Sequence, residues 1–505
     1  MENEIRPILS SKHPKAVVLL ISALYFLCSI PVYSNPSVED TFNFNIIEGT
    51  NEVEINGFSH DAPPASDEEE LVIPAQVTLS GKTYNVVSVT GFSGRDKLPS
   101  VIIPEGVRTI GKWAFQYCYE LTAVSLPNSL KSIEATAFGS CTKLANITLP
   151  GNIETIGQYV FSKCYALTNI TIPASIKLLD RDAFGDCGLI EVTINGTGET
   201  VLEEGIFSFC KFLEKVTIND GISHIPNKMF LSCKKLSVVT LPQSLTSIGE
   251  EAFESCESLQ AVELPANLNT IGRWAFSYCK ALTSVAIPQG VTILPTEVFR
   301  ECSYLKSVTL SQGLTEIGKL AFYDCSRLEF INFPESLETI GENAFYNCSE
   351  LTALTIPVKV NSIGFTAFHR CQGLKDIYVF WKNPLKINSG TFLAVDKYTC
   401  TLHVPPGTKA AYESATEWQE FNIVDDATGL QKIDGTQLTV YPNPASDYIC
   451  IEGMDGRCNV AIFSLQGRLL TQQEISSGAK IRIDYLSPGI YLVKAGDTTF
   501  RIVKK

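Results

Sequence analysis

The sequence predicts a solenoid of stacked 23-residue coils with a parallel β ladder and short helical turns, followed by a small C-terminal β-sandwich. Three observations predict the stack. Twelve cysteines recur with this one period from Cys118 to Cys371, a Phe stands three residues before each of them, and an Ile or Leu stands eight residues before each. A period of this length marks one structural unit per repeat, and such a unit buries its core only against its neighbours.

A single repeat shows how each coil is built. Residues 252–259 place apolar side chains at positions i, i+1, i+4 and i+7, which predicts a short helical turn. Residues 259–264 alternate like a half-buried strand, and Pro265 ends that strand because it has no N–H for a ladder. A second extended piece, 268–271, leads to a turn at Gly272. About thirteen coils at ~4.8 Å per strand predict a ladder about 60 Å long.

One coil departs from the period without changing its length. After Cys187, the strand at 189–194 begins one residue early, and residues 195–198 add that residue back before Cys210. This compensation keeps the core in register and predicts an irregular surface turn. The turn is either a binding loop or a tolerated variation, of which the second is the simpler account.

The sequence outside the repeats divides into an N-terminal segment, two caps, a linker and a tail. Terminal coils of a solenoid need a cap because they have no neighbour on one side. The tail reads as seven short strands, which predicts the β-sandwich. The expected segments after the N-terminal one are a β cap at 35–91, repeats at 92–378, a C-terminal cap at 379–426, a linker at 427–437 and the tail at 438–505.

The N-terminal segment, 1–34, is expected to be an export signal. Lys12 and Lys15 precede an apolar run at 16–30, and Ser34 closes a stretch of small residues suited to signal cleavage. The run is too short to span a bilayer comfortably, and no other hydrophobic span follows. We therefore expect a mature chain without a transmembrane segment.

The composition argues against several classes of function. A net charge of −14 and a pI near 5.0 disfavour nucleic acid and anionic membrane as partners, because both attract basic surfaces. Five histidines leave little material for catalysis or metal binding. A hydrolase would need a nucleophile, a base and an orienting group, and no such set stands out. We therefore assign no catalytic residue, no metal ligand and no cofactor.

The cysteine column is the most conspicuous candidate for chemistry. Stacked coils would bring neighbouring Cys backbones near the separation that a disulfide tolerates. A one-dimensional file of thiols, however, does not supply the tetrahedral ligands of a zinc site. Each Cys stands at an inward position between Phe and Leu, where free Cys packs as a small hydrophobe, so we expect core packing. Cys450 and Cys458 lie outside the column and could pair with each other in the tail.

Outward strand positions are where a solenoid usually presents its binding surface. Most of one outward column is threonine, which the strand preference of β-branched residues explains without a ligand. Against this background five larger residues stand out near the C-terminal end, and they form the candidate binding face: Glu329, Phe330, Asn332, Lys375 and Tyr378. An aromatic residue with flanking charges is typical of a contact hot spot, but the same residues could pack under the C-terminal cap. Both interpretations remain open.

The repeat resembles a known family. The unit L-x-x-V-x-L-P-x-x-L-x-x-I-G-x-x-A-F-x-x-C-x-x, as in residues 259–281, is similar to the BspA-like type of bacterial leucine-rich repeat. The resemblance covers about residues 71–424 and implies a leucine-rich-repeat solenoid. The sequence departs from the pattern at the irregular coil and where Asn195, Asn219 and Ser311 replace the Pro.

The tail resembles the C-terminal sorting domain of cargo for the type IX secretion system. The matching residues include Gly489 and Tyr491 and the run Tyr441, Pro442, Asn443 and Pro444. The resemblance implies recognition by the type IX secretion machinery, a bacterium of the Bacteroidetes group, and a protein that is secreted or held at the outer-membrane cell surface.

BspA-like proteins have been linked with adhesion to host matrix proteins and with contact between bacteria. The resemblance therefore implies a non-enzymatic module that binds a protein, with host extracellular matrix as one candidate. A glycan-binding accessory protein is the alternative, although exposed aromatic residues that could stack on sugars look sparse. A surface hydrolase is the least favoured reading.

Overall fold

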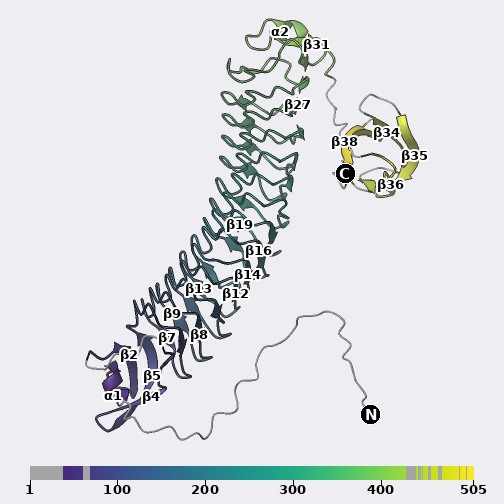
Figure 1. Ribbon diagram of the computed structural model, residues 1–505. Helices are drawn as coiled ribbons and strands as arrows, with labels where there is room; N and C mark the ends of the chain where they lie inside the picture. The colour runs from purple at the N-terminus through teal and green to yellow at the C-terminus, as the bar shows by residue number, and fades with distance from the viewer. Residues whose placement is uncertain are drawn as a thin grey trace, which may run out of the picture.

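The computed structural model describes residues 38–60 and 69–427, and most of 439–504. Figure 1 shows the middle range as one long, curved stack of coils. The predicted export signal with its cleavage position Ser34 and residues 428–437 of the predicted linker lie outside the described residues. Within the tail, the positions outside the description are 442–444, 446, 453–455, 465–468, 488 and 496–497.

Nearly every coil contributes one strand to a ladder that we call the front ladder, and the coil of Ala261 joins it through a single bridge to Ser284. Its strands pair in parallel, as Val285 with Val308, and their inward side chains are buried while their outward ones face solvent. The strands are β3 (Leu71–Val72), β6 (Ser100–Ile102), β8 (Ala123–Ser125), β10 (Asn146–Ile147), β12 (Asn169–Ile172), β14 (Glu191–Ile194), β16 (Lys215–Ile218), β18 (Val238–Thr240), β21 (Ser284–Ala286), β23 (Ser307–Thr309), β25 (Phe330–Ile331), β27 (Ala353–Ile356), β29 (Asp376–Val379), β30 (Thr401–His403) and β31 (Asn422–Val424).

The second extended piece of each coil forms another parallel ladder, the back ladder. Most of its strands are two residues long and end in the Ile or Leu that stands eight residues before Cys. They are β5 (Lys82–Thr90), β7 (Thr109–Ile110), β9 (Ser132–Ile133), β11 (Thr155–Ile156), β13 (Leu178–Leu179), β15 (Val201–Leu202), β17 (His224–Ile225), β19 (Ser247–Ile248), β20 (Thr270–Ile271), β22 (Ile293–Leu294), β24 (Glu316–Ile317), β26 (Thr339–Ile340) and β28 (Ser362–Ile363).

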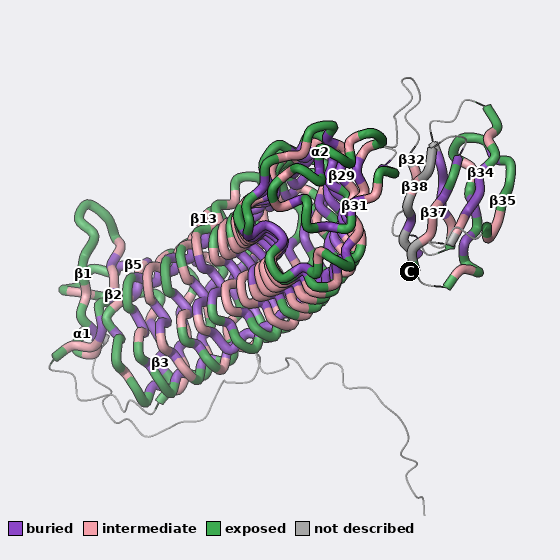
Figure 2. Tube along the Cα trace, turned by 90° about the horizontal axis from the view of Figure 1, so that it is seen from above, coloured by how far each residue is buried: buried purple, intermediate pink, exposed green. Residues whose placement is uncertain are grey.

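The predicted solenoid is confirmed, with about 15 turns where the sequence predicts about thirteen. The difference arises at the ends, because β3 extends the front ladder before the first repeat and β30 and β31 extend it after the last. Buried residues run through the centre of the whole stack (Figure 2), so the core is continuous.

The strand register confirms the compensated coil. Asn169 pairs with Glu191, which is one residue short of the period, and Glu191 pairs with Lys215, which is one residue beyond it. On the back ladder, Leu178 still pairs with Val201 at the regular period, so the irregularity is confined to the front of the coil. The shift turns Ile190 outward, and its side chain is 41% exposed.

The prediction of a helical turn in each coil is wrong. Two residues, five and one before each Cys, take left-handed φ, as Trp274 (56°) and Tyr278 (58°) do before Cys279, and a right-handed helix cannot pass through them. Backbone N–H groups in the turn instead donate either to the next coil or to a carbonyl of the same turn. Phe276 donates to the next coil at Val298 (3.0 Å), and Cys279 donates back within its own turn to Phe276 (3.2 Å). These turns reproduce the spacing of apolar residues that suggests a helix.

The Phe residues form one continuous column of stacked rings from Phe92 to Phe392. Neighbouring ring centroids lie 5.1–5.8 Å apart, with planes within 1–22° of parallel. At the N-terminal end Phe58 meets Phe92 edge-on, and at the C-terminal end Phe421 meets Phe392 edge-on. A ring that packs edge-on ends the column, because it does not need a further ring stacked on it. Both caps therefore close the core with aromatic contacts.

The cysteine column packs in the core, as expected, and also has a hydrogen-bonding role. All fifteen described cysteines are free, and the twelve in the column are buried. Each column Sγ–H donates to the carbonyl of the Phe one coil back, at 2.8–3.4 Å. The carbonyl of Phe253 thus accepts from the Cys256 N–H (3.2 Å) and from the Cys279 thiol (3.3 Å), which satisfies both of its lone pairs.

The N-terminal cap consists of a short helix and two hairpins. At the N-terminal end, α1 (Val38–Thr41) precedes an antiparallel hairpin of β1 (Phe42–Ile47) and β2 (Glu52–Phe58), and β2 pairs in parallel with β5. Alternate side chains of β2 are fully buried, and Val53 and Ile55 belong to the solenoid core. A second hairpin joins β4 (Gln76–Leu79) to β5.

At the C-terminal end, the cap contains a short helix, α2 (Lys409–Glu413). The chain then turns through Glu417, whose φ of 74° is incompatible with a continuing helix. Trp418, which is 1% exposed, packs edge-on against Tyr412 of α2, so the short helix closes the core.

The tail forms two antiparallel sheets with a buried cluster of their own, separate from the solenoid core. Cys450 and Cys458 are both free, so the pairing that the sequence allows is not formed. The β-sandwich stays a prediction. The strands are β32 (Thr439–Tyr441), β33 (Tyr448–Glu452) and β36 (Lys480–Arg482) in one sheet, and β35 (Leu469–Ser476), β34 (Arg457–Ser464), β37 (Gly489–Ala495) and β38 (Thr498–Lys504) in the other.

Truncation of a core ring should cost more stability than loss of a thiol. We expect Phe253→Ala to lower the unfolding free energy by about 3–5 kcal/mol, because it opens a cavity in the stacked column. Cys256→Ala should cost about 1–2 kcal/mol, since one thiol contact and one weak hydrogen bond are lost. Urea denaturation followed by circular dichroism measures both. Equal losses for the two variants would contradict the ranking.

Alkaline pH should destabilise the stack through the thiols. Burial raises the pKa of Cys164 and of Cys210 to about 12, whereas thiols of the unfolded chain ionise near pH 9. Between these values only the unfolded state loses the proton, so each such thiol lowers stability by about 1.4 kcal/mol per pH unit. Urea midpoints between pH 8 and 10.5 should fall more steeply for the wild type than for Cys210→Ala. Identical slopes would count against this linkage.

Candidate binding face on the front ladder

The candidate face lies on outward positions of successive front strands near the C-terminal end of the stack. Phe330 opens β25, where it pairs with Ser307 of β23. The equivalent position of β27 is Ala353. Because the strand neighbours at this position are small, the half-buried Phe330 ring stands above the surface beside it.

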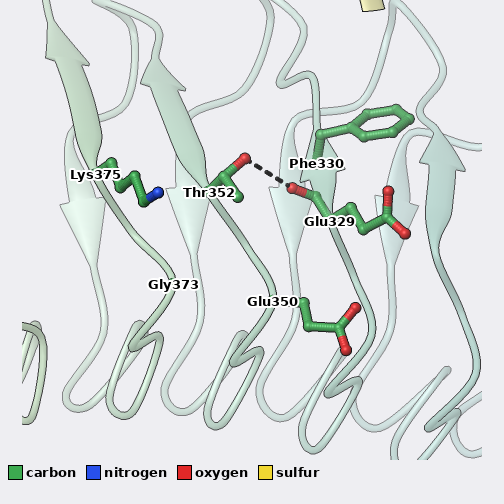
Figure 3. Close-up of a pocket in the computed structure, with 6 residues that line it drawn as sticks. All are labelled: Glu329, Phe330, Glu350, Thr352, Gly373 and Lys375. Atoms are coloured by element: carbon green, nitrogen blue, oxygen red, sulfur yellow. Dashed lines mark hydrogen bonds between the residues drawn. The ribbon is translucent and has the colours of Figure 1, made fainter. Parts of the chain in front are cut away.

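Three of the five predicted residues meet in one shallow hollow of about 480 Å³. Its lining consists of Glu329, Phe330, Glu350, Thr352, Gly373 and Lys375 (Figure 3). Glu350, Thr352 and Gly373 are not among the residues that the sequence singles out, because they look like ordinary variation within a single repeat.

The backbone fixes the positions of these lining residues. Thr352 donates its N–H (3.2 Å) and its Oγ1–H (3.3 Å) to the carbonyl of Glu329, and Lys375 donates its N–H to the carbonyl of Thr352 (2.9 Å). Glu329, Thr352 and Lys375 therefore stand in one file across three successive coils.

Gly373 keeps the hollow open. A Cβ at this position would lie 2.6 Å from the carbonyl oxygen of Ser349 and 3.0 Å from that of Leu351, which no side chain tolerates. Gly373 stands one coil after Glu350 at the equivalent position, where it presents only backbone. The missing side chain leaves the depression beside Glu350.

The hollow carries charges of both signs. Glu329 pairs with Lys306 of the preceding coil at 3.6 Å, but both side chains are about half exposed, so the pair contributes little to stability. Among the described residues, neither Lys375 nor Glu350 forms an ion pair through its side chain. Figure 3 shows the Lys375 side chain extending toward Thr352, across the opening from the two carboxylates. A ligand can therefore meet an ammonium on one side of Thr352 and carboxylates, with the Phe330 ring, on the other.

The other two predicted residues lie outside the hollow. Asn332 is exposed and follows β25. Tyr378 of β29 stacks on His403 of β30, with ring centroids 4.1 Å apart and planes 8° from parallel. His403 in turn contacts Asp426 through Nδ1 (2.7 Å) and Asp376 through Nε2 (3.3 Å). Tyr378 thus packs toward the C-terminal cap, and Asn332 remains an open position beside the hollow.

Exposed aromatic residues are not sparse, so that expectation is wrong. They gather on the cysteine edge, which we define as the turns from six residues before each column Cys to two residues after it. The signal was present in the sequence, but these positions read as faces of a short helix. The exposed aromatic residues there are Trp113, Tyr117, Tyr119, Tyr159, Tyr165, Phe209, Phe212, Tyr304 and Phe365.

The histidines do not assemble a catalytic set in the described part of the chain. His224 Nδ1 lies 2.7 Å from Ser247 Oγ, but no carboxylate is hydrogen-bonded to this imidazole among the described residues, and burial lowers the His224 pKa. His369 packs edge-on against Tyr346 at 4.8 Å, and its pKa is lowered by burial and by Arg370. No cluster of three or more metal-binding side chains occurs in the regions described.

The predicted sorting motif is only partly within the described residues. Tyr441 ends β32 and Gly489 begins β37. The Tyr491 hydroxyl donates to the carbonyl of Ser487 at 2.8 Å. Pro442, Asn443 and Pro444 lie outside the description. No helix among the described residues is long and apolar enough to cross a bilayer.

Comparison with family models matches both parts of the chain. The model described as BspA type leucine rich repeat region matches residues 85–210, 181–306 and 279–399, which together exceed half of the chain. The model described as secretion system C-terminal sorting domain matches residues 439–505. Neither of these models describes an enzyme.

A solved structure has the same fold. A leucine-rich repeat protein from Bacteroides ovatus is 26% identical, with a TM-score of 0.56 over 72% of this chain and 98% of that chain. A leucine rich cell surface protein from Faecalibacterium prausnitzii is 23% identical, with a TM-score of 0.36 over 76% of this chain and 93% of that chain. A leucine rich repeat protein from T. pallidum is 24% identical, with a TM-score of 0.33 over 49% of this chain and 90% of that chain. No protein of curated function matches the chain.

The matched repeat region, its shared core columns and the tail therefore agree on one assignment. The chain belongs to the BspA-type leucine-rich repeat family and carries a secretion-system C-terminal sorting domain, which indicates type IX secretion to the cell surface or the extracellular space.

Proposed function

We propose that the solenoid is a non-enzymatic module that binds another protein outside the cell, in adhesion to a host matrix or in contact between cells. The observation that supports this most is the hollow at Phe330, where an aromatic ring between small strand neighbours stands at one side of a surface that carries carboxylates and an ammonium. A large aromatic residue beside charged groups is typical of a protein-contact hot spot.

The rigidity of the scaffold supports the same proposal. The Phe column and the backbone bonds between coils hold the outward side chains before any partner arrives. A preorganised surface loses little conformational entropy on binding, so a modest set of contacts yields useful affinity. Several weak contacts along the ladder could add through multivalency.

The proposal extends to location. A signal at 1–34 would carry the chain across the inner membrane, and the sorting domain would then pass it to the type IX machinery of a Bacteroidetes bacterium. Extracellular delivery suits a binding module, because its partner is then met outside the cell.

Truncation of the ring tests the proposal. The full chain should bind at least one member of an array of extracellular-matrix proteins saturably, and Phe330→Ala should weaken that binding at least tenfold, since the central apolar contact is lost. The unfolding free energy should fall by no more than about 1 kcal/mol, because the ring is half exposed. Biolayer interferometry and urea denaturation measure the two effects.

Phe365→Ala is the matched control. This residue is also an exposed Phe of the solenoid, at 54%, but it lies on the cysteine edge, so its truncation should leave binding unchanged. Equal weakening by both variants would assign the effect to general surface hydrophobicity. A large loss of stability in Phe330→Ala would make the ring a packing residue, and binding to glycans alone would contradict the proposed partner class.

A further inference from the structure

A second hollow, of about 430 Å³, lies at the opposite end of the stack from Phe330. It forms where the N-terminal cap meets the first coils, with contributions from β2, β5 and the turns that follow β7 and β9. Its lining consists of Asn56, Thr90, Gly91, Ser93, Lys112, Trp113 and Glu134. One large aromatic residue among polar side chains is a different chemistry from that of the Phe330 hollow.

Trp113 is held open to solvent by its place in the coil. It occupies the left-handed position five residues before Cys118, with φ of 57°, and its side chain is 56% exposed. The equivalent positions one coil before and one coil after it are Thr90 and Thr136, which are too small to cover an indole. No ring or cation packs on Trp113 among the described residues.

Trp274 shows what a covered indole looks like at the same position. Its φ is 56°, but the guanidinium of Arg273 lies 4.9 Å from its ring centroid and the residue is only half exposed. A cation over the ring occupies the surface that a ligand would need. The two tryptophans therefore differ in access and share the same backbone setting.

Polar groups with both hydrogen-bonding characters surround Trp113. Asn56 Oδ1 accepts from the Thr90 hydroxyl at 3.2 Å, which leaves the Asn56 amide hydrogens available as donors. Lys112 adds an ammonium and Glu134 a carboxylate, and neither forms an ion pair through its side chain among the described residues. Charged residues at positions equivalent to Lys112 elsewhere in the stack pair between coils, as Arg273 does with Glu250 at 3.1 Å.

Glycines bring the cap close to the first coil and leave the floor of the hollow bare. Gly57 and Gly91 both take left-handed φ, at 77° and 82°. A Cβ on Gly91 would lie 2.6 Å from Asn56 Oδ1, and one on Gly57 would lie 2.4 Å from the carbonyl oxygen of Gly91. Any other residue at these positions would push Asn56 away from Thr90.

We propose that this hollow binds a saccharide, with the indole of Trp113 as the platform for one face of a pyranose ring. A pyranose has apolar C–H faces that suit an exposed aromatic plane and a rim of hydroxyls that needs interleaved donors and acceptors. One ammonium balanced by one carboxylate favours a neutral sugar over an anionic one. An apolar ligand would leave Asn56, Lys112 and Glu134 without partners.

A chain of sugars fits this surface better than a single sugar does. Tyr117 and Tyr119, in the same coil as Trp113, are 44% and 45% exposed, and their ring centroids lie 6.1 Å apart. They offer further exposed aromatic surface in the same coil, so affinity should rise with chain length. This site is independent of the proposed protein-binding face, since the two share no residue.

Tryptophan fluorescence of the full chain provides the test. Of the four tryptophans, Trp381 and Trp418 are only 8% and 1% exposed, so quenching by acrylamide reports on Trp113 and Trp274. The probes are neutral hexasaccharides of glucose, mannose, xylose and N-acetylglucosamine. At least one should protect the wild type from quenching saturably, with a Kd below about 10 mM, and more tightly than its monosaccharide.

Trp113→Ala should weaken this binding at least tenfold, measured by calorimetry or saturation-transfer NMR, and Trp274→Ala should leave it unchanged. Asn56→Ala, which keeps the indole and removes one donor, should weaken it a fewfold. An unchanged thermal midpoint for each variant shows that the coil is intact, and Trp113→Phe, which restores an aromatic plane, should recover part of the affinity if Ala disturbs the fold.

Several outcomes would overturn the saccharide site. The first is that no hexasaccharide protects the tryptophans from quenching. The second is that the wild type and Trp113→Ala bind the sugar equally well. The third is that Trp113→Ala and Trp274→Ala weaken sugar binding equally. Loss of matrix-protein binding in Trp113→Ala, with no response to sugars, would make the hollow a protein contact instead. Because Phe330→Ala is tested on matrix proteins, failure of either proposal leaves the other standing.

Discussion

The carbonyl group of each column Phe is the constraint on which the stack depends. It lies in a buried core, where an unpaired acceptor costs about 1–3 kcal/mol. In most coils both of its lone pairs are filled, as at Phe253, by an N–H of its own coil and a thiol of the next. That second bond needs a small side chain with one donor that tolerates apolar surroundings. Serine would bring a more strongly hydrated hydroxyl, and alanine no donor at all. Cysteine meets both demands, which accounts for its place beside the Phe rings in twelve coils.

Because the shared residues all serve this core, binding specificity has to come from residues that differ between coils. The two hollows show how such differences create a binding surface. Gly373 creates one by omitting a side chain beside Glu350, and Trp113 dominates the other by exceeding the size of its neighbours Thr90 and Thr136. In both places the regular scaffold supplies position and rigidity, and a single departure from the repeat supplies the shape.

The period and the columns of Phe, Cys and Leu predict the solenoid well, because a repeated core leaves few alternatives. The turns were less predictable. The spacing of apolar residues around Phe253 fits a helix and these turns equally well. The left-handed residues of the turn, Glu251 and Ser255, are not glycines, so the sequence does not reveal them. Glu329 and Lys375 share one column and Phe330 stands in the next, and all three could be found as departures from their columns. Glu350 and Gly373 belong to a further column, and only the stacking of coils shows that it shares a depression with the others.

Similar contacts between coils also give the solenoid a constant spacing along its length. Each coil makes the same kinds of thiol, ring and backbone contacts with its neighbour, so one whole coil could be gained or lost without opening the core. The hollows at Trp113 and Phe330 are about nine coils apart, or about 45 Å at ~4.8 Å per coil. Duplication of a coil between them would move the two surfaces apart by about 5 Å and rotate one against the other, leaving both intact. In this fold, repeat number sets the reach between binding surfaces.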